Sequence, residues 1–281
     1  MEDLLQSLVI QWSSEAYRHF ILCFKTLFWL PQGNKKKGVI NLIRKRMKRW
    51  IDGDYFGLWR ELLARVAREA NKRRRTVPSS NYKRAVSFVR NGDLSGALNA
   101  LTSKGVAPID ADRKATILEL HPRAENPSLP DPAPKPTAAK QASEEMVRKI
   151  ILDMKVTKAG GPDGDKPAYW VALMKIVNHQ AILTDLTTII NRIMRGDVPD
   201  RQAVFASRLT LIYKDTAKQK VRPIAVGCML RKIAAIATTS LAKQPFKEAV
   251  GPHHVGLGVK RGVDIASAPH STHTAGTKTS L

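Results

Sequence analysis

Apolar residues recur at helical spacing along most of this chain. The first example lies at the N-terminus, where leucines, Val9 and Trp12 fall three or four residues apart and predict an amphipathic helix. This helix packs either on the body of the protein or on a partner, and the pattern does not choose between them. Similar patterns predict two helices on either side of a break at 52–54, a helical hairpin at 83–101, and helices at 111–120, 143–155, 167–177, 181–195 and 230–241.

Two short segments have the β-prone composition of strands. They run from Ser207 to Asp215 and from Val221 to Gly227, with a polar link between them. Strands this close in sequence are expected to pair as an antiparallel hairpin. The expected fold is therefore mostly α with one small antiparallel β-hairpin, in the α+β class.

The predicted hairpin carries two cations near its tip, Lys214 and Arg222. Lysine supplies a compact point charge and arginine a planar fork of donors, so the pair is suited to hold a polyphosphate. We expect Lys214 and Arg222 to bind a polyphosphate. The alternatives are that both are solvated cations at strand ends, or that Arg222 pairs with Asp215.

The composition points to a polyanionic partner. The chain has 281 residues and holds 47 Lys and Arg against 24 Asp and Glu, for a net charge of +23. Such a balance favours RNA or DNA as a partner over a protein with a merely basic surface. Only Cys23 and Cys228 are present, which indicates a reducing compartment and no disulfide partner.

No membrane partner is expected, because the most apolar stretch, 20–30, is short and contains Lys25. The N-terminus carries Glu2 and Asp3 where a signal peptide is positively charged. We therefore expect an intracellular protein, nuclear or cytoplasmic.

The basic residues concentrate before residue 80, in runs separated by apolar positions at helical spacing. These runs are expected to contact nucleic acid, with a solvated helix face or a nuclear-localisation patch as the alternative. Aromatic residues between the runs, among them Trp50 and Phe56, could stack on bases, but the core of a small helical unit is the better interpretation. The expected nucleic-acid-binding cations are Lys35, Lys36, Lys37, Arg44, Lys45, Arg46, Lys48, Arg49, Lys72, Arg73, Arg74 and Arg75.

Proline divides the chain. Residues 122–140 hold six prolines between 122 and 136 and predict a stiff, extended linker. The expected organisation is a basic helical nucleic-acid-binding region at 1–121, the linker at 122–140, a second domain at 141–266 and a disordered tail at 267–281.

The second domain contains a series of short motifs: a Gly-rich element, a strand ending Tyr-Lys, an Arg-Pro-Ile segment, a helix and a second Gly-rich loop. In that order they are Ala159–Gly164, Tyr213-Lys214, Arg222–Ile224, Leu230–Ile233 and Gly256–Gly262. The series resembles the reverse transcriptases of non-LTR, LINE-like retrotransposons, in which such motifs occur in the same order. The match covers roughly 143–266, and its order and spacing are more specific than any single motif.

The resemblance implies a partial reverse-transcriptase domain made of the fingers and the start of the palm. Lys214 and Arg222 would neutralise the triphosphate of an incoming deoxynucleotide. The two glycine-rich loops would lie near the backbone of template or primer. The residues expected to do so are Gly160, Gly161, Gly164, Gly258, Lys260 and Arg261.

The chain departs from the family at the residues that carry out the family's catalysis. Family members hold two Mg²⁺ ions on palm aspartates, including an Asp-Asp pair that this sequence lacks. Asp163 and Asp165 lie before the fingers motifs, and His253-His254 has no further ligand at zinc spacing. We therefore expect no metal, no cofactor and no catalytic residue here, and no primer extension by this chain.

The resemblance thus implies a fragment of a retroelement RNA-directed DNA polymerase that binds RNA, DNA and, weakly, deoxynucleoside triphosphate. The alternative is a non-enzymatic nucleic-acid-binding protein in which the basic helices bind and the C-terminal half is scaffold. A third and weaker hypothesis is a degraded reading frame, favoured by the patternless tail.

Overall fold

The computed structural model describes residues 1–28, 36–73, 81–120, 140–176, 179–215 and 220–250. These residues form a mostly helical protein with one small antiparallel sheet, which confirms the expected fold class. The elements are α1 (Glu2–Gln11), α2 (Ser14–Phe28), α3 (Lys36–Ile51), α4 (Tyr55–Arg73), α5 (Asn81–Arg90), α6 (Leu94–Leu101), β1 (Val106–Ala107), α7 (Ala111–Leu120), α8 (Glu144–Leu152), α9 (Pro167–Leu173), α10 (Gln180–Met194), α11 (Arg201–Phe205), β2 (Ser207–Asp215), β3 (Lys220–Gly227) and α12 (Met229–Val250).

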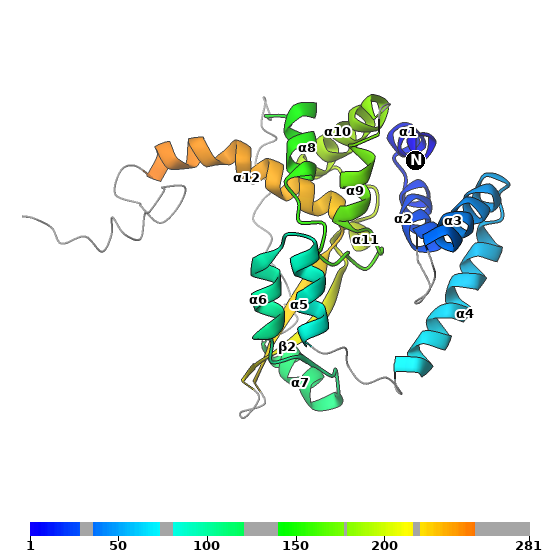
Figure 1. Ribbon diagram of the computed structural model, residues 1–281. Helices are drawn as coiled ribbons and strands as arrows, with labels where there is room; N and C mark the ends of the chain where they lie inside the picture. Colours follow the sequence, from blue (N-terminus) through cyan, green and yellow to red (C-terminus); the bar gives the residue numbers. More distant parts are fainter. Residues whose placement is uncertain (29–35, 74–80, 121–139, 177–178, 216–219, 251–281) are drawn as a thin grey trace, which may run out of the picture.

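The main core joins the first two helices to the C-terminal ones. Leu5 and Phe20, from α1 and α2, are buried in the same cluster as Trp170, Leu186 and Ile233 from α9, α10 and α12. Figure 1 shows this helical body at the top, with the sheet below it. The first helix therefore packs on the body of the protein. The predicted linker lies mostly outside the described residues, and elements before and after it share one core.

Polar contacts fix α1 against the far end of α10. The indole of Trp12 donates a 2.8 Å hydrogen bond to Asp197, and Arg192 lies 4.9 Å from the centre of the Trp12 ring. Arg192 also donates to the carbonyl of Val9 at 2.8 Å. Trp12 ends α1 in a left-handed conformation (φ 37°), which turns the chain into α2.

A second, smaller core connects α2 to α3 and α4. It contains Cys23, Leu27, Trp50 and Leu58, all buried. Trp50 lies beside His19 of α2, with ring centres 4.8 Å apart, so the C-terminal end of α3 packs against α2. The basic helical unit is therefore attached to the main body through α2.

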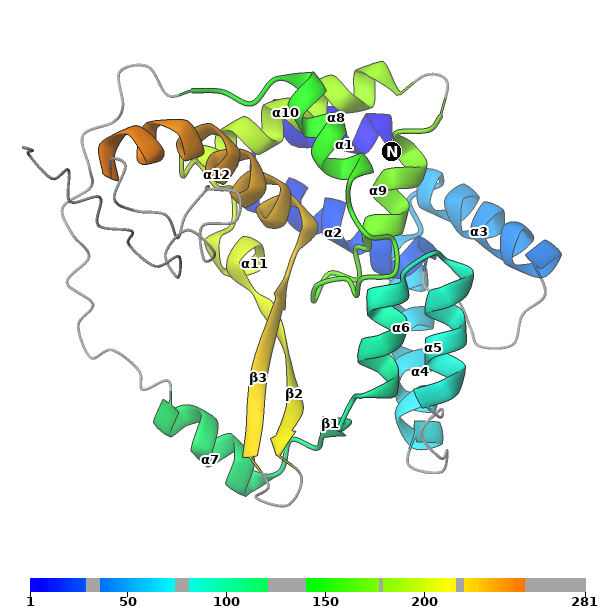
Figure 2. The same cartoon turned by 60° about the vertical axis from the view of Figure 1, so that its left-hand side comes forward.

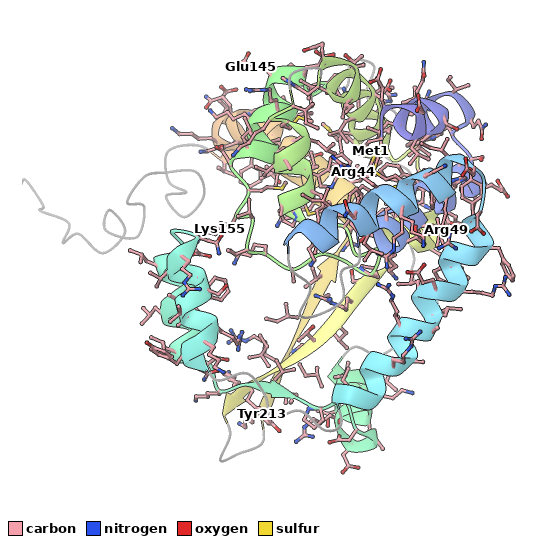
Figure 3. All side chains as sticks on the ribbon, turned by 45° about the vertical axis from the view of Figure 1, so that its right-hand side comes forward. Met1, Arg44, Arg49, Glu145, Lys155 and Tyr213 are labelled. Carbon is pink, nitrogen blue, oxygen red and sulfur yellow. The ribbon has the colours of Figure 1, made fainter. Side chains whose placement is uncertain are left out.

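The α5–α6 hairpin forms as the sequence predicts, with its turn at Asn91–Asp93. It buries only small residues against Phe88, so it has little core of its own. Asp93 caps α6 by accepting from the amide of Gly96 at 2.9 Å, and it also accepts from Lys155 and Thr157 at 3.0 Å each. Figure 3 shows Lys155 close to this end of the hairpin. A single carboxylate thus joins the hairpin to the segment after α8.

The sheet has the order β1–β2–β3, and both pairings are antiparallel. β2 and β3 form the predicted hairpin, paired from Ser207–Gly227 to Asp215–Lys220 with a bulge between Tyr213 and Asp215. The short strand β1, which the sequence did not indicate, pairs Val106 with Ile212. In Figure 2 the hairpin runs from the helical body down to β1 and α7.

Candidate nucleic-acid interface

The hairpin brings its two predicted cations to the same end. Arg222 is paired directly with Ile212, and Lys214 lies two residues further along β2, in the bulge. Because residues two apart in a strand share a face, regular alternation places Lys214, Ile212 and Arg222 on one face, although the bulge loosens that rule at Lys214. Both cations are exposed, and neither makes an ion pair with a side chain that the structure describes. The side chain of Asp215, the alternative partner of Arg222, lies outside the described residues.

Two further cations that the sequence analysis missed lie at this end of the hairpin. Lys104, from the segment before β1, donates to the carbonyl of Lys214 at 2.9 Å, and Lys220 opens β3 with an exposed side chain. Pairing of β1 with β2 brings Lys104 here, across 110 positions of sequence. Only a prediction of that third strand could have found it.

Arg113 of α7 braces the same end of the sheet. Its guanidinium carbon lies 5.6 Å from the centre of the Tyr213 ring, and it donates to the Tyr213 hydroxyl at 3.2 Å. It also forms an ion pair with Asp110. Arg113 therefore stabilises this end of the hairpin. Figure 3 labels Tyr213 at the lower end of the hairpin.

The basic run of α3 divides into two faces. Arg44, Lys45 and Lys48 are exposed and stay candidates for phosphate contact. The side chain of Arg46, by contrast, is 3% exposed, with bonds to Glu61 (2.9 Å) and to the carbonyl of Leu27 (3.3 Å). The expectation that Arg46 binds nucleic acid is corrected here, because its charge is already used inside the protein.

Arg49 is also paired with acidic side chains of the protein, although it is less buried than Arg46. It pairs with Asp54 at 2.8 Å and with Glu61 at 2.9 Å, and its side chain is 30% exposed. Burial alone would raise the pKa of Glu61, but Arg46 and Arg49 outweigh that effect and lower it. Glu61 therefore stays ionised and holds the two arginines. Figure 3 shows Arg44 and Arg49 at separate points along α3.

The aromatic residues near these cations also include both buried and exposed side chains. Trp50 is buried, and Tyr55 packs against it with ring centres 4.8 Å apart. Phe56 is 68% exposed, and Arg60 lies 4.7 Å from its ring centre. The described structure thus leaves Phe56 as the aromatic residue of this region best placed to stack on a base.

The glycine-rich loop at 158–167 packs within the protein. Gly160 and Gly161 are buried. A side chain at Gly161 would place its Cβ only 2.6 Å from the carbonyl oxygen of Gly227, and one at Gly160 would collide with the backbone of Asp165. Close packing within the chain explains these two glycines, while Gly164 is only half-buried. Contact of this loop with nucleic acid stays a prediction.

Two buried carboxylates complete the loop. The backbone amide of Asp165 donates to Asp163 at 3.3 Å, and the indole of Trp170 donates to Asp165 at 2.6 Å. Burial raises the pKa of Asp163, and burial together with the neighbouring Asp163 raises the pKa of Asp165 well above its usual range. Both carboxylates therefore help to hold the loop in its conformation.

Several predicted residues cannot be placed. Lys35, Arg74, Arg75, Gly258, Lys260 and Arg261 lie outside the described residues. Lys36, Lys37, Lys72 and Arg73 belong to α3 and α4, but the positions of their side chains are not described.

In the part of the chain that the structure describes, no three His, Cys, Asp or Glu side chains gather as a metal site would require. None of the described helices is both long and apolar enough to span a bilayer. Cys23 and Cys228 are free thiols and are buried. Comparisons with models of protein families, with curated proteins and with solved structures found no match.

Proposed function

We propose that this chain binds RNA and DNA without strong sequence preference, as the basic helical region and fingers of a reverse-transcriptase-like protein. Its hairpin binds nucleoside triphosphate weakly. The observation that carries the proposal is the group of cations at the hairpin tip, which make no ion pair with any described side chain. They are Lys104, Lys214, Lys220 and Arg222.

The register of the hairpin supports a shared anion. Diagonal neighbours across an antiparallel pair have Cα atoms roughly 7–8 Å apart, which suits Arg222 and the bulged Lys214. Long side chains at that spacing can bring a guanidinium and an ammonium to one polyphosphate. The guanidinium would bind two oxygens with its planar fork, and the ammonium would add a point charge.

Titration with a fluorescent nucleoside triphosphate tests the hairpin. Arg222→Ala is expected to weaken binding more than Arg222→Lys, because lysine keeps the charge and loses only the fork. Arg208→Ala is the matched control, since Arg208 is exposed on the face that alternation gives to Arg222, at the opposite end of β2. Equal affinities of the Arg222→Ala and Arg208→Ala proteins would refute the triphosphate site.

Titration with duplex DNA at several salt concentrations tests the basic helix. If about five cations contact phosphate, the logarithm of the affinity should fall against the logarithm of salt with a slope of about −4 to −5. Replacing Arg44, Lys45 and Lys48 by Gln should reduce that slope and weaken all sequences alike. An affinity for DNA that does not change with salt concentration would contradict the proposal. Salt-dependent binding without any triphosphate binding would favour a non-enzymatic nucleic-acid-binding protein.

A further inference from the structure

A groove of about 490 Å³ lies between α8 and α12. Both helices belong to the helical body, and Figure 1 shows them away from the lower end of the hairpin. One face of each helix lines the groove. Met146 and Ile150 are one helical turn apart on α8, and Lys232 and Ile236 are one turn apart on α12. Pockets that hold small ligands have volumes of about 300–1,000 Å³, so the space suits a ligand of nucleotide size.

The floor of the groove is apolar. Ile150 and Met154 are each 9% exposed, and Ile236 on the opposite side is 36% exposed. Methionine is flexible and polarisable, so it adapts to a flat ligand surface. A purely ionic ligand would gain nothing from this floor, whereas a nucleobase would bury one of its faces on it.

The rim of the groove is cationic. Lys149 from α8, Lys158 from the following segment and Lys232 from α12 are exposed, and none forms an ion pair with a described side chain. A fourth lysine, Lys155, is held by Asp93 at 3.0 Å. The groove also contains one carboxylate, Asp153, so the rim keeps an excess of positive charge.

We propose that this groove binds a short single-stranded segment of RNA or DNA, with the three lysines on phosphates and the apolar floor under a base. This inference rests on the proposed function and adds a second site to it. An acidic peptide fits less well. Helix-in-groove binding uses anchors over several turns, and strand addition needs a free sheet edge, whereas this groove is nucleotide-sized and lies between two helices.

A labelled oligo(dT) of about ten nucleotides tests the site, because single-strand sites span about 4–16 nucleotides. The triple variant Lys149→Gln, Lys158→Gln, Lys232→Gln is expected to bind on the order of tenfold more weakly and to lower the salt slope by about 2, at roughly 0.7 per phosphate contact. The control triple Arg148→Gln, Lys175→Gln, Lys243→Gln makes the same charge change at exposed positions outside the groove. It should leave the affinity close to that of the unaltered chain.

Photocrosslinking of an oligonucleotide containing 4-thiouridine gives an independent readout, with crosslinks expected in peptides of α8 and α12. If the two triple variants bind equally well and crosslinks fall elsewhere, the groove proposal is overturned while the proposed function stands. If the unaltered chain binds no nucleic acid, both proposals fail. If the groove variant loses affinity for polyglutamate but keeps its affinity for oligo(dT), the site binds acidic peptides and our assignment is overturned.

Discussion

Asn191 closes a pair of hydrogen bonds that the apolar pattern of α10 does not reveal. The residue is 9% exposed, and its side chain accepts from the amide of Ala142 at 2.8 Å and donates to the carbonyl of the same residue at 3.0 Å. Buried backbone groups need partners, and Ala142 comes just before α8, where no helical bond is available. This one side chain therefore positions the start of the C-terminal half.

Replacing Asn191 by Leu should lower the free energy of unfolding by about 2–6 kcal/mol. Both backbone groups of Ala142 would lose their partner, and each unsatisfied group costs about 1–3 kcal/mol. Urea unfolding followed by circular dichroism measures the change. Asn99→Leu, at an exposed position of α6, is the control. Equal shifts in the two variants would show that the paired bonds contribute little.

Asp165 should make the protein less stable as pH rises. Its pKa is raised in the folded state, chiefly by burial and then by Asp163, so the folded protein holds a proton that the unfolded chain releases near pH 4. Stability is therefore highest below the unfolded pKa and falls as pH rises toward the folded pKa.

Asp165→Asn should remove much of this loss, because an amide oxygen still accepts from Trp170 and carries no charge. The loss of stability between pH 5 and pH 8 should therefore be smaller in the variant than in the unaltered chain. Thermal unfolding at the two pH values checks this, with Asp52→Asn as an exposed control. A variant less stable than the unaltered chain at both pH values would show that the carboxyl group itself is needed.

At the scale of elements, the α5–α6 hairpin depends on Asp93. The amide of Gly96 first, then Lys155 and Thr157, lower the pKa of Asp93 to about 2. The contacts it makes as an anion are fully present above its unfolded pKa near 3.9 and are lost as pH falls through about 2.

Asp93→Ala should loosen the hairpin from the body without unfolding the main core. Hydrogen exchange measured by mass spectrometry should become faster in 81–101 and around 155–157, while peptides of α10 keep their protection. Asp93→Asn keeps the cap and loses the charge, so it should give an intermediate effect. Unchanged exchange in the Asp93→Ala protein would mean that other contacts hold the hairpin.

The periodicity of apolar residues predicted most helices, because each helix buries one face. The β2–β3 hairpin was predicted because each of its strands is a segment of β-prone residues. The sequence pattern missed α11, which has only five residues and begins at the capping carboxylate of Asp200. It missed β1, which has two residues and exists only because β2 lies beside it. Both elements span about one period, so they show no repeated pattern. The sequence also did not predict α2 as a helix, because its apolar residues run together from Phe20 to Phe24 without a clear period.

The candidate site was harder to predict for a different reason. A run of cations in the sequence does not show which ones meet an acid in the fold. Arg46 lies within the same run as Lys45, yet Glu61 and the Leu27 carbonyl bind it inside the protein. Likewise, Lys104 joins the hairpin only through the pairing of β1 with β2. Charge density was predictable, whereas its division into structural and exposed cations required the tertiary contacts.

At the scale of the whole molecule, α1 and α2 belong to the same core as the C-terminal helices. Five large residues from these two helices are buried there: Leu5, Leu8, Tyr17, Phe20 and Phe24. Burying one such side chain contributes about 1.5–3 kcal/mol. Their combined contribution is comparable to the roughly 5–15 kcal/mol by which whole domains are stable.

A chain comprising only 140–281 should therefore fail to fold cooperatively, even though it holds every motif of the predicted second domain. Thermal unfolding and the fluorescence of Trp170, buried at 0% exposure in the intact protein, measure this. A chain in which a flexible linker replaces 36–120 is the control, and it should keep a cooperative transition because α1 and α2 remain. If 140–281 alone unfolds cooperatively with a buried Trp170, that region is an independently folding domain, and the core that it shares with α1 and α2 is dispensable.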